Sequence, residues 1–425
     1  MKGLGWKEYK KFLQRNYLAE MDPVVDMLIQ KEEQRQIYGA ELIASENYTS
    51  PAVLEALATC LSHKYAEGYP GRRYYAGCEY YDEIESIAIE RAKKLFGAEY
   101  ANVQPLSGNP ANLAVYFAFL NPGDTILAMA LDHGGHLSHG HKSNFSGKLW
   151  NFVWYHTSKK DGRIDMEEVE KLAREHKPKM IVVGYSAYPR VPDWKWFRDI
   201  AEDVGAYTFA DISHISGLIA GKQIPSPIDA DFDVVMTTTH KTLRGPRGAL
   251  ILCKEEFGKD IDKAVFPMVQ SGPHMHAIAA KAVCFKEAMT PEFRAYTKRI
   301  IDNAKRMARV MKEFDYKIVT DGTDNHLLLV DLRNKDIRGK QAQETLEKAY
   351  IFVNKNVIPW DPNPPTDPSG IRIGTPIIST RGLKPDDVEV LTQFIDRVLG
   401  GEDPAEVRRE VMEFMGQFPI FAWYN

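Results

Sequence analysis

Cysteine is scarce in this sequence, and the few cysteines follow no pattern. The chain of 425 residues contains only Cys60, Cys78, Cys253 and Cys284, and no two of them form a Cys-x-x-Cys spacing. Zinc ribbons and redox-active cysteine pairs need such a spacing, and disulfide scaffolds need a higher density of cysteine. The cysteines therefore favour a protein of the reducing cytoplasm.

An excess of basic charge and long apolar runs are also absent. The 54 Lys and Arg residues against 58 Asp and Glu residues give a net charge of −4, which does not suit binding along a phosphate backbone. No segment reaches the roughly 18 consecutive apolar residues of a membrane span, and the first residues lack the apolar stretch of a signal peptide. We therefore expect no nucleic-acid partner and no membrane partner.

Three common site motifs are missing as well. The chain contains neither GxxxxGK[ST] nor GxGxxG, which excludes a P-loop and a dinucleotide-binding turn of the usual type. It also lacks HExxH, the helical zinc motif of many hydrolases. A nucleotide-binding or zinc-hydrolase function thus finds no support in the motifs.

A rhythm of short apolar and longer amphipathic segments is present, and it predicts the fold class. From about Tyr100 to Cys253, β-branched runs such as MIVVGYS alternate with amphipathic runs such as DWKWFRDIAEDVG, which is typical of an α/β protein with a mostly parallel sheet covered by helices. Length alone favours about two domains. We predict an N-terminal helical arm (1–45), a large domain (46–290) and a smaller C-terminal α/β domain (291–425).

Lys241 is a charged residue at the end of an apolar segment, which is an unusual position for an exposed lysine. It ends the apolar strand predicted at 233–241 and precedes a Gly-Pro-Arg-Gly turn, which places its amine at the carboxyl edge of the sheet. Desolvation there lowers the pKa of an ammonium group, and Schiff-base chemistry requires the neutral amine. A lysine that simply begins an exposed loop is the alternative, and Lys241 alone does not decide between the two.

Two further positions could hold the parts of a charged ligand. Asp211 ends the strand in FADISH and is expected to be buried, where a pyridinium nitrogen, a helix N-terminus or a structural ion pair could serve as its partner. Ser107, Gly108 and Asn109 lie between a short strand and a helix. Backbone N–H groups at such a helix start suit a single phosphate, although a simple capped helix would look the same.

Four histidines lie close together in DHGGHLSHGH, at His133, His136, His139 and His141. No carboxylate or cysteine ligand set accompanies them, so we expect no metal. An imidazole flanked by glycines suits stacking on a flat cofactor. Lysine, acid, phosphate site and stacking ring are together the parts that a pyridoxal phosphate site requires. An amino-acid substrate would add a carboxylate, and Arg372, between two isoleucines in GIRIGTP, is the best candidate to bind it in a bidentate manner.

With these residues in place, the chain resembles serine hydroxymethyltransferase, a pyridoxal phosphate enzyme of the aspartate-aminotransferase-like fold. The similarity covers most of the chain, from Glu41 to about Gly382, and is carried by ELIASENYTS, KYAEGYPGRRYYAGCEYYDEIE, VQPLSGNPAN, HGGHLSHG, NFSGKLWN, GYSAY, FADISHISGLIAG, TTTHKTLRGPRG and SGIRIGTP. The resemblance implies reversible conversion of L-serine and a reduced pterin, such as tetrahydrofolate, to glycine and the methylene-pterin.

The resemblance also implies a role for each residue that matches a family motif. Lys241 would bind the cofactor covalently, with Thr238 as a hydrogen-bond neighbour of its amine, while Asp211 would pair with the pyridine nitrogen and His136 would stack on the ring. The phosphate would be held by Ser107, Gly108 and Asn109, with His240 nearby and Gly272 from the neighbouring subunit. The residues beside the phenolic oxygen of the ring would be Ser186 and His214.

The substrate side of the site follows in the same way. Arg372 and Ser45 would bind the substrate carboxylate, assisted by Tyr75, while Glu67 and Tyr65 match the active-site acid of the family and its neighbouring tyrosine. Because Tyr65, Glu67 and Tyr75 are implied to cross a dimer interface, the resemblance implies a homodimer with shared sites, and a tetramer of such dimers stays open.

The pterin end departs from the family pattern. The implied contacts fall at Leu131, Gly135, Leu137 and Asn356, but Pro364, Pro365 and Thr366 replace an aromatic-containing segment, with Trp360 added upstream. A modified pterin is therefore one alternative. Another is a pterin-independent pyridoxal phosphate aldolase that acts on β-hydroxy amino acids such as threonine. A non-catalytic RNA-binding role is disfavoured by the charge.

Overall fold

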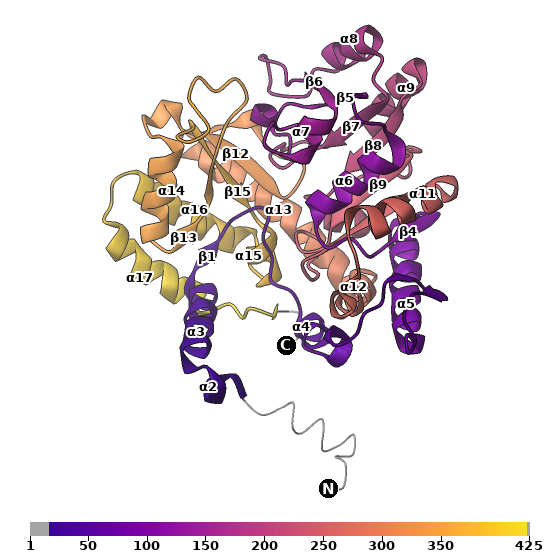
Figure 1. Cartoon of the computed structure of the whole chain (residues 1–425). Coiled ribbons are helices and arrows are strands. Elements are labelled where there is room, and N and C mark those ends of the chain that lie inside the picture. The colour runs from indigo at the N-terminus through magenta and orange to yellow at the C-terminus, as the bar shows by residue number, and fades with distance from the viewer. Residues whose placement is uncertain (1–16, 423–425) are drawn as a thin grey trace, which may run out of the picture.

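The computed structural model describes residues 17–422 (Figure 1). The first 16 residues of the predicted N-terminal arm lie outside the described residues. The rest of the arm contains α2 (Tyr17–Met21), α3 (Pro23–Tyr38) and the short strand β1 (Ala40–Glu41). Helix α3 begins in the usual way for a capped helix, since Asp22 accepts a hydrogen bond from the Val25 N–H and Pro23 occupies the first turn.

A seven-stranded sheet forms the centre of the larger part of the molecule. The strand order is β4-β10-β9-β8-β7-β5-β6, and β10 alone runs against its neighbours in this sheet. The mostly parallel sheet predicted from the alternating pattern is thus confirmed. Its strands are β4 (Tyr100–Asn102), β5 (Thr125–Met129), β6 (Asn151–Tyr155), β7 (Met180–Gly184), β8 (Tyr207–Asp211), β9 (Val234–Thr238) and β10 (Ala249–Cys253).

Alternate residues of these strands enter two different hydrophobic cores, one on each face of the sheet. Ile181 and Val183 of β7 belong to one core, whereas Met180 and Val182 belong to the other. The first core is shared with α5 (Glu79–Phe96), α8 (Met166–His176), α9 (Trp194–Val204) and α12 (Met275–Ala288), and the second with α6 (Gly108–Phe119) and α11 (Gly258–Lys263). Because both faces are covered, the strands read as continuous apolar runs.

The smaller part contains a four-stranded antiparallel sheet of order β11-β12-β15-β14. Its strands are β11 (Lys317–Ile318), β12 (Leu327–Asp331), β15 (Gly370–Gly374) and β14 (Asn354–Asn356), and the helices around it are α14 (Gly339–Lys348), α16 (Pro385–Leu399) and α17 (Pro404–Met415). The N-terminal strand β1 pairs in parallel with β13 (Ile351–Phe352). Ala40 and Leu42 therefore belong to the core of the C-terminal part.

Helix α13 (Pro291–Glu313) connects the two parts, and its side chains enter both cores. Ile300 and Ile301 pack in the core of the larger part, whereas Met307 and Met311 pack in the smaller one. The domain limits at 45 and 290 stay a prediction, and the change from one core to the other falls within this helix. The remaining short elements are α4 (Pro51–Leu57), α7 (Phe145–Leu149), α10 (Ser216–Ala220), α15 (Pro376–Thr380) and the hairpin of β2 (Gly68–Tyr69) and β3 (Arg72–Arg73).

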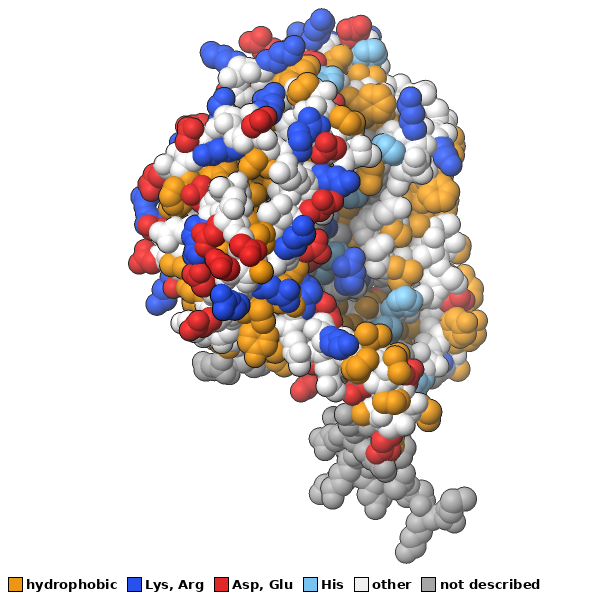
Figure 2. Space-filling model, turned by 90° about the vertical axis from the view of Figure 1, so that its left-hand side faces the viewer, with side chains coloured by type: hydrophobic (Ala, Val, Ile, Leu, Met, Phe, Trp, Pro, Cys, Tyr) orange, Lys and Arg blue, Asp and Glu red, His pale blue; other side chains and the backbone are white. Residues whose placement is uncertain are grey.

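In the described part of the chain, no helix is both long enough and apolar enough to span a membrane. Figure 2 shows one face of the molecule, on which acidic, basic and apolar side chains are mixed, with a hollow between two lobes where basic and histidine side chains are visible.

Candidate active site

The candidate cofactor residues gather at the carboxyl ends of β7, β8 and β9. Asp211 is the last residue of β8, Ser186 follows the end of β7, and Lys241 follows the end of β9. Because these three strands are parallel, their carboxyl ends meet at one edge of the sheet, where ligands bind in α/β proteins of this type.

Strand β9 is shorter than the sequence predicted, and Lys241 lies in the turn that follows it. The strand was expected to reach residue 241, but it ends at Thr238. The backbone turns there because the Thr239 carbonyl accepts a hydrogen bond from the Gly245 N–H at 2.7 Å, and the Thr239 hydroxyl donates to the Pro246 carbonyl. Threonine favours strands, so the three consecutive threonines gave no sign of this turn.

The Lys241 amine is largely shielded by the protein and hydrogen-bonded. Its Nζ donates to Thr238 Oγ1 at 2.8 Å. Burial lowers the pKa of Lys241 to about 8, with Asp211 acting against this shift and Arg372 and Arg247 acting with it. A substantial fraction of the amine is therefore neutral near physiological pH, as a nucleophilic lysine requires.

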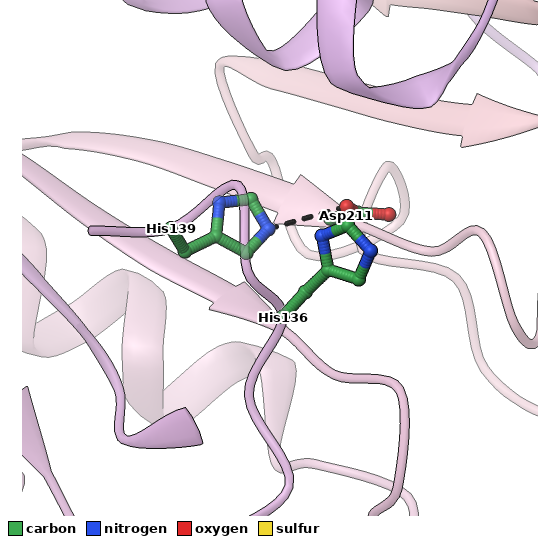
Figure 3. Close-up of side chains that lie close together, drawn as sticks. All are labelled: His136, His139 and Asp211. Atoms are coloured by element: carbon green, nitrogen blue, oxygen red, sulfur yellow. Dashed lines mark hydrogen bonds and ion pairs between the residues drawn. The ribbon is translucent and has the colours of Figure 1, made fainter. Parts of the chain in front are cut away.

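Asp211 is buried within a network of donors (Figure 3). Its Oδ2 accepts hydrogen bonds from His139 Nε2 at 3.2 Å and Asn112 Nδ2 at 3.0 Å, and its Oδ1 accepts from the Ser213 N–H at 3.0 Å. Burial alone would raise the pKa of this carboxyl, but the hydrogen bond and charge of His139, with the other donors, hold it well below its usual range. The carboxylate is therefore ionised and can pair with a cationic ring nitrogen.

His136 is joined to the same network through Ser138. Its Nδ1 lies 2.6 Å from Ser138 Oγ, and that hydroxyl accepts a hydrogen bond from Asn112 Nδ2 at 2.7 Å. Burial lowers the pKa of His136 to about 4, so its ring is neutral and suited to stacking. Ligand atoms of His136, His139 and Asp211 lie within 4.8 Å of one another, which is close enough to hold a metal. However, His139 Nε2 donates its proton to the Asp211 carboxylate, whereas a metal ligand needs a nitrogen with a free lone pair.

The phosphate candidates lie at the start of α6. Ser107 is the N-cap residue, and its side chain makes no capping hydrogen bond in the described structure, which leaves the N–H groups of the first turn available. A Cβ at Gly108 would lie 2.8 Å from Thr238 Cγ2. Nearby, Asn109 Oδ1 accepts a hydrogen bond from Asn144, and burial lowers the pKa of His240 to about 3.

Arg372, in the centre of β15, is the candidate for binding a carboxylate. Its Nε donates to Asn354 Oδ1 at 3.0 Å, and its Nη1 donates to the Ser186 carbonyl. Burial lowers the pKa of Arg372 to about 10, with Glu46 acting against this shift. Within residues 17–422 the guanidinium forms no ion pair, so part of its hydrogen-bonding capacity can serve a substrate. Ser45 is half-buried and follows the segment of β1.

Ser186 and His214 make hydrogen bonds with protein groups. Ser186 Oγ donates to the Gly135 carbonyl at 2.9 Å, and His214 Nδ1 lies 3.1 Å from His326 Nε2. Burial holds the pKa of His214 well below its usual range, and the charges of Lys241 and Arg372 act in the same direction.

Tyr65, Glu67, Tyr75 and Gly272 form a second group. Tyr65 and Tyr75 stack with ring centroids 5.5 Å apart, and Glu67 Oε1 accepts a hydrogen bond from Ser271 Oγ at 2.5 Å. A Cβ at Gly272 would lie 3.3 Å from Glu67 Cγ. None of the hydrogen bonds or ring contacts described for these four residues reaches Lys241, Asp211 or His136. With 66% of Tyr65 and 45% of Tyr75 exposed, this group is much more open than the first.

Three of the pterin candidates, Leu131, Gly135 and Leu137, lie in the segment that follows β5. Leu131 and Leu137 are exposed, Gly135 packs against the carbonyls of Met129 and Ala130, and Asn356 ends β14. Trp360, from the segment that departs from the family pattern, reaches the residues that follow β5. Its Nε1 donates to the Thr157 carbonyl at 2.9 Å, and its ring meets the edge of His133 at 4.7 Å between centroids. The altered segment is thus anchored on the larger part of the molecule.

Four residues of this arrangement had no assigned role in the sequence. Asn112 and His139 hold Asp211, Asn354 holds Arg372, and His326 contacts His214. For Asn112 a signal existed, because it lies one helical turn after Gly108 and so on the same face of α6. The other contacts join residues distant in the sequence, and no local pattern indicates them.

One edge of the sheet thus brings together a lysine with a lowered pKa, an ionised buried acid, a neutral imidazole and a helix N-terminus, which are the parts that a pyridoxal phosphate-dependent enzyme requires. Comparison with known families identifies the family. The family model described as serine hydroxymethyltransferase matches residues 18–395, and the chain belongs to this family. The fold is the aspartate-aminotransferase-like fold that the resemblance implied. The enzyme is a glycine hydroxymethyltransferase, with pyridoxal phosphate as cofactor and tetrahydrofolate as co-substrate.

Proposed function

We propose that Lys241, Asp211 and His136 hold pyridoxal phosphate, with its phosphate at the start of α6. The observation that carries this proposal is the Lys241 amine itself. Its pKa is lowered to about 8, and it lies at the edge of the sheet where β8 ends with Asp211. When bound, the cofactor supplies an electron sink for charge that develops at the α-carbon of the amino acid. The protein contributes the ionised Asp211, which keeps the ring nitrogen protonated, and the neutral His136, which covers the ring.

Arg372 and Ser45 bind the carboxylate of serine or glycine in this proposal. The Arg372 guanidinium is fixed by Asn354 and by the Ser186 carbonyl, so little freedom is lost when a carboxylate binds. A bound carboxylate would also neutralise a buried positive charge. The fixed Arg372 guanidinium thus determines where the substrate carboxylate lies relative to the cofactor.

In this proposal, Glu67 accepts or donates a proton at the substrate hydroxyl or at the incoming pterin, and Tyr65 lies beside it. We propose that Tyr65, Glu67, Tyr75 and Gly272 complete the site of a second copy in a homodimer. Support comes from the exposure of Tyr65 and Tyr75 and from the absence of Lys241 among the hydrogen bonds and ring contacts of these four residues within the described chain.

The pterin ring would lie along Leu131, Gly135, Leu137 and Asn356, with Trp360 at the edge of this surface. The exposed leucines offer an apolar face to a flat ring. We also propose a cytoplasmic enzyme, in line with its four unpaired thiols.

The test is conversion of serine to glycine by purified protein loaded with pyridoxal phosphate and supplied with tetrahydrofolate. The wild-type protein should show a visible absorption band that is lost in Lys241→Ala and Lys241→Gln. Lys254→Ala is the matched control, because Lys254 also follows a strand of this sheet, β10, but pairs with Asp231 and Asp233 instead.

A panel of reduced pterins then identifies the preferred co-substrate from the rate of glycine formation. Threonine cleavage without pterin that exceeds serine turnover would contradict the assignment and indicate an aldolase. A visible band that persists in both Lys241 variants after all amino acids have been removed from the protein would exclude Lys241 as the covalent anchor.

A further inference from the structure

Lys281 is a lysine of the protein interior that the proposed function leaves unused. It lies in the middle of α12 and is only 2% exposed. Its Nζ donates hydrogen bonds to three backbone carbonyls, at 2.6 Å to Val103, 3.0 Å to Pro105 and 2.8 Å to Ala249. A buried charge is costly unless it is fully hydrogen-bonded, and these three carbonyls match the three N–H groups of an ammonium.

Three acceptors favour the charged form of Lys281. A neutral amine has only two N–H groups, so it would leave one of the three carbonyls without its donor. Burial lowers the pKa of Lys281 to about 7, and the charge of Glu85 acts against this shift. The carbonyls act in the same direction as Glu85, because hydrogen bonds to the charged form of a group favour that form. An ammonium group is thus enclosed between α12 and two other segments of the chain.

Gly248 leaves the space that the Lys281 side chain fills. A Cβ at Gly248 would lie 2.5 Å from Lys281 Cε, which no side chain could occupy without displacing the lysine. One turn further along α12, Cys284 Sγ donates to the Leu243 carbonyl at 3.4 Å. Both Leu243 and Gly248 follow Lys241 in the turn after β9. Helix α12 is therefore packed directly against the turn that carries Lys241.

Two of the three carbonyls belong to the segment between β4 and α6. Gln270 holds the same segment with its side chain, because its Nε2 donates to the Gln104 carbonyl at 2.9 Å and its Oε1 accepts from the Leu106 N–H at 3.1 Å. The peptide group that joins Pro105 to Leu106 is thus fixed at both ends. Lys281 binds its carbonyl, and Gln270 binds its N–H.

This segment leads directly into the start of α6. Ser107 follows Leu106, and in the described structure its side chain does not cap the helix, so the N–H groups of the first turn are available for an anion. The direction of these N–H groups depends on the backbone that precedes them. That backbone is held by Lys281 and Gln270.

We propose that Lys281 is a positioning residue whose buried ammonium group holds the start of α6 in the orientation that binds the cofactor phosphate. This proposal rests on the function proposed above, in which the phosphate lies at Ser107, Gly108 and Asn109. All three N–H groups of Lys281 are used by carbonyls, so none is left for the phosphate itself. Loss of Lys281 should therefore weaken phosphate binding through the backbone, and binding of the cofactor ring should not change.

Two analogues of the cofactor separate phosphate binding from ring binding. Deoxypyridoxine phosphate and deoxypyridoxine carry a methyl group in place of the aldehyde, so neither can react with Lys241, and they differ only in the phosphate. Equilibrium dialysis against apoprotein measures the affinity of each. In Lys281→Met the affinity for the phosphorylated analogue should fall about tenfold, as for one lost hydrogen bond to a charged group, and the other affinity should stay within about twofold.

Lys286→Met is the matched control for this variant. Lys286 is an exposed lysine of the same helix, and its replacement should leave both affinities at the wild-type values. A merely structural role of Lys281 would change the fraction of folded protein and so lower both affinities together. The ratio of the two affinities is therefore the quantity that decides.

Lys281→Ala tests the ammonium group itself. This variant lacks the part of the side chain that n-propylammonium reproduces, whereas tetramethylammonium carries the same charge but no N–H group. Propylammonium chloride should restore most of the affinity for deoxypyridoxine phosphate, and tetramethylammonium chloride at the same concentration should not. Because both salts are compared within one variant, this test does not depend on the folding of Lys281→Met.

Equal losses for the two analogues in Lys281→Met, or no loss for either, would overturn the proposal, as would equal effects of the two salts on Lys281→Ala. Wild-type apoprotein that binds both analogues with the same affinity would instead contradict the proposed phosphate site at the start of α6, so the two failures are distinguishable.

Discussion

The two groups of candidate residues differ in how much of their chemistry the chain itself sets. Lys241, Asp211 and His136 are held by hydrogen bonds among side chains of the same chain, and burial or neighbouring charge moves each of their pKa values. Tyr65 and Tyr75 are exposed and stack on each other, and Glu67 accepts a hydrogen bond from Ser271. In the proposed site, one chain builds the cofactor half, and the open group would be completed by a second copy of the chain.

The largest effect is expected at Asp211 in the buried half. Asp211→Asn removes the charge that keeps the ring nitrogen protonated, and kcat for serine should fall by roughly 10²–10³-fold. Steady-state kinetics of the fully loaded variant measure this.

Asp262→Asn is the matched control for this variant. Asp262 is also a buried acid with an asparagine partner, Asn102, but it lies outside the site. Comparable losses in the two variants would mean that Asp211 acts through folding alone.

The open half can be tested by mixing two inactive proteins. Lys241→Ala and Glu67→Gln should each lose activity, the latter by roughly 10²-fold or more if it acts as an acid or base. When the two are unfolded and refolded together, random pairing should restore about a quarter of wild-type activity, because half the dimers carry one intact site of two.

Each variant refolded alone controls for recovery. Mixed protein that stays inactive, while each variant refolds to a dimer, would show that Glu67 and Lys241 act within one chain.

Each group of candidate residues contains a glycine, so adding a methyl group at that glycine compares how tightly the two groups are packed. Gly108→Ala places a Cβ 2.8 Å from Thr238 Cγ2, and it should weaken pyridoxal phosphate binding by roughly tenfold, which is about 1.4 kcal/mol. Gly272→Ala places a Cβ 3.3 Å from the flexible Glu67 side chain and 3.5 Å from the Tyr65 ring, and it should have a smaller effect. Fluorescence titration of the apoproteins measures both.

In Gly108→Ala combined with Thr238→Ser, the methyl group is gone and the hydroxyl that bonds Lys241 stays. Recovery of affinity would assign the loss to this contact, and no recovery would assign it to crowding of the phosphate.

The smallest expected effect is a shift along the pH axis. Only the neutral Lys241 amine attacks the cofactor, so the rate of uptake by apoprotein should rise with pH through a midpoint near 8. At pH 8 about half of the Lys241 amines are neutral, whereas a lysine with the ordinary value of 10.5 would be neutral in only about 0.3% of molecules. Stopped-flow absorbance measures the rate, with N-acetyl-lysine as the control amine. A midpoint near 10 would contradict the desolvation of Lys241.

The sequence indicated the fold well where the physical signal is local. The apolar runs of the sheet and the amphipathic run that became α9 are readable because both sheet faces are covered and the helix buries one side. The end of β9 was misplaced, because Thr239 reads as a strand residue but makes turn contacts. The pairing of His214 with His326 depends on how the two parts meet, and no periodicity within either segment carries that information.

The pairing of β1 with β13 has a consequence for how the chain folds during synthesis. The larger core is built from one continuous stretch and can form as soon as that stretch has left the ribosome. The smaller core needs Ala40 and Leu42 together with strands from near the other end of the chain. The N-terminal segment must therefore wait, with these apolar side chains unprotected, until the strands up to β15 have been made. Arg372 and His326, which the smaller part supplies, are thus the last groups to join the site.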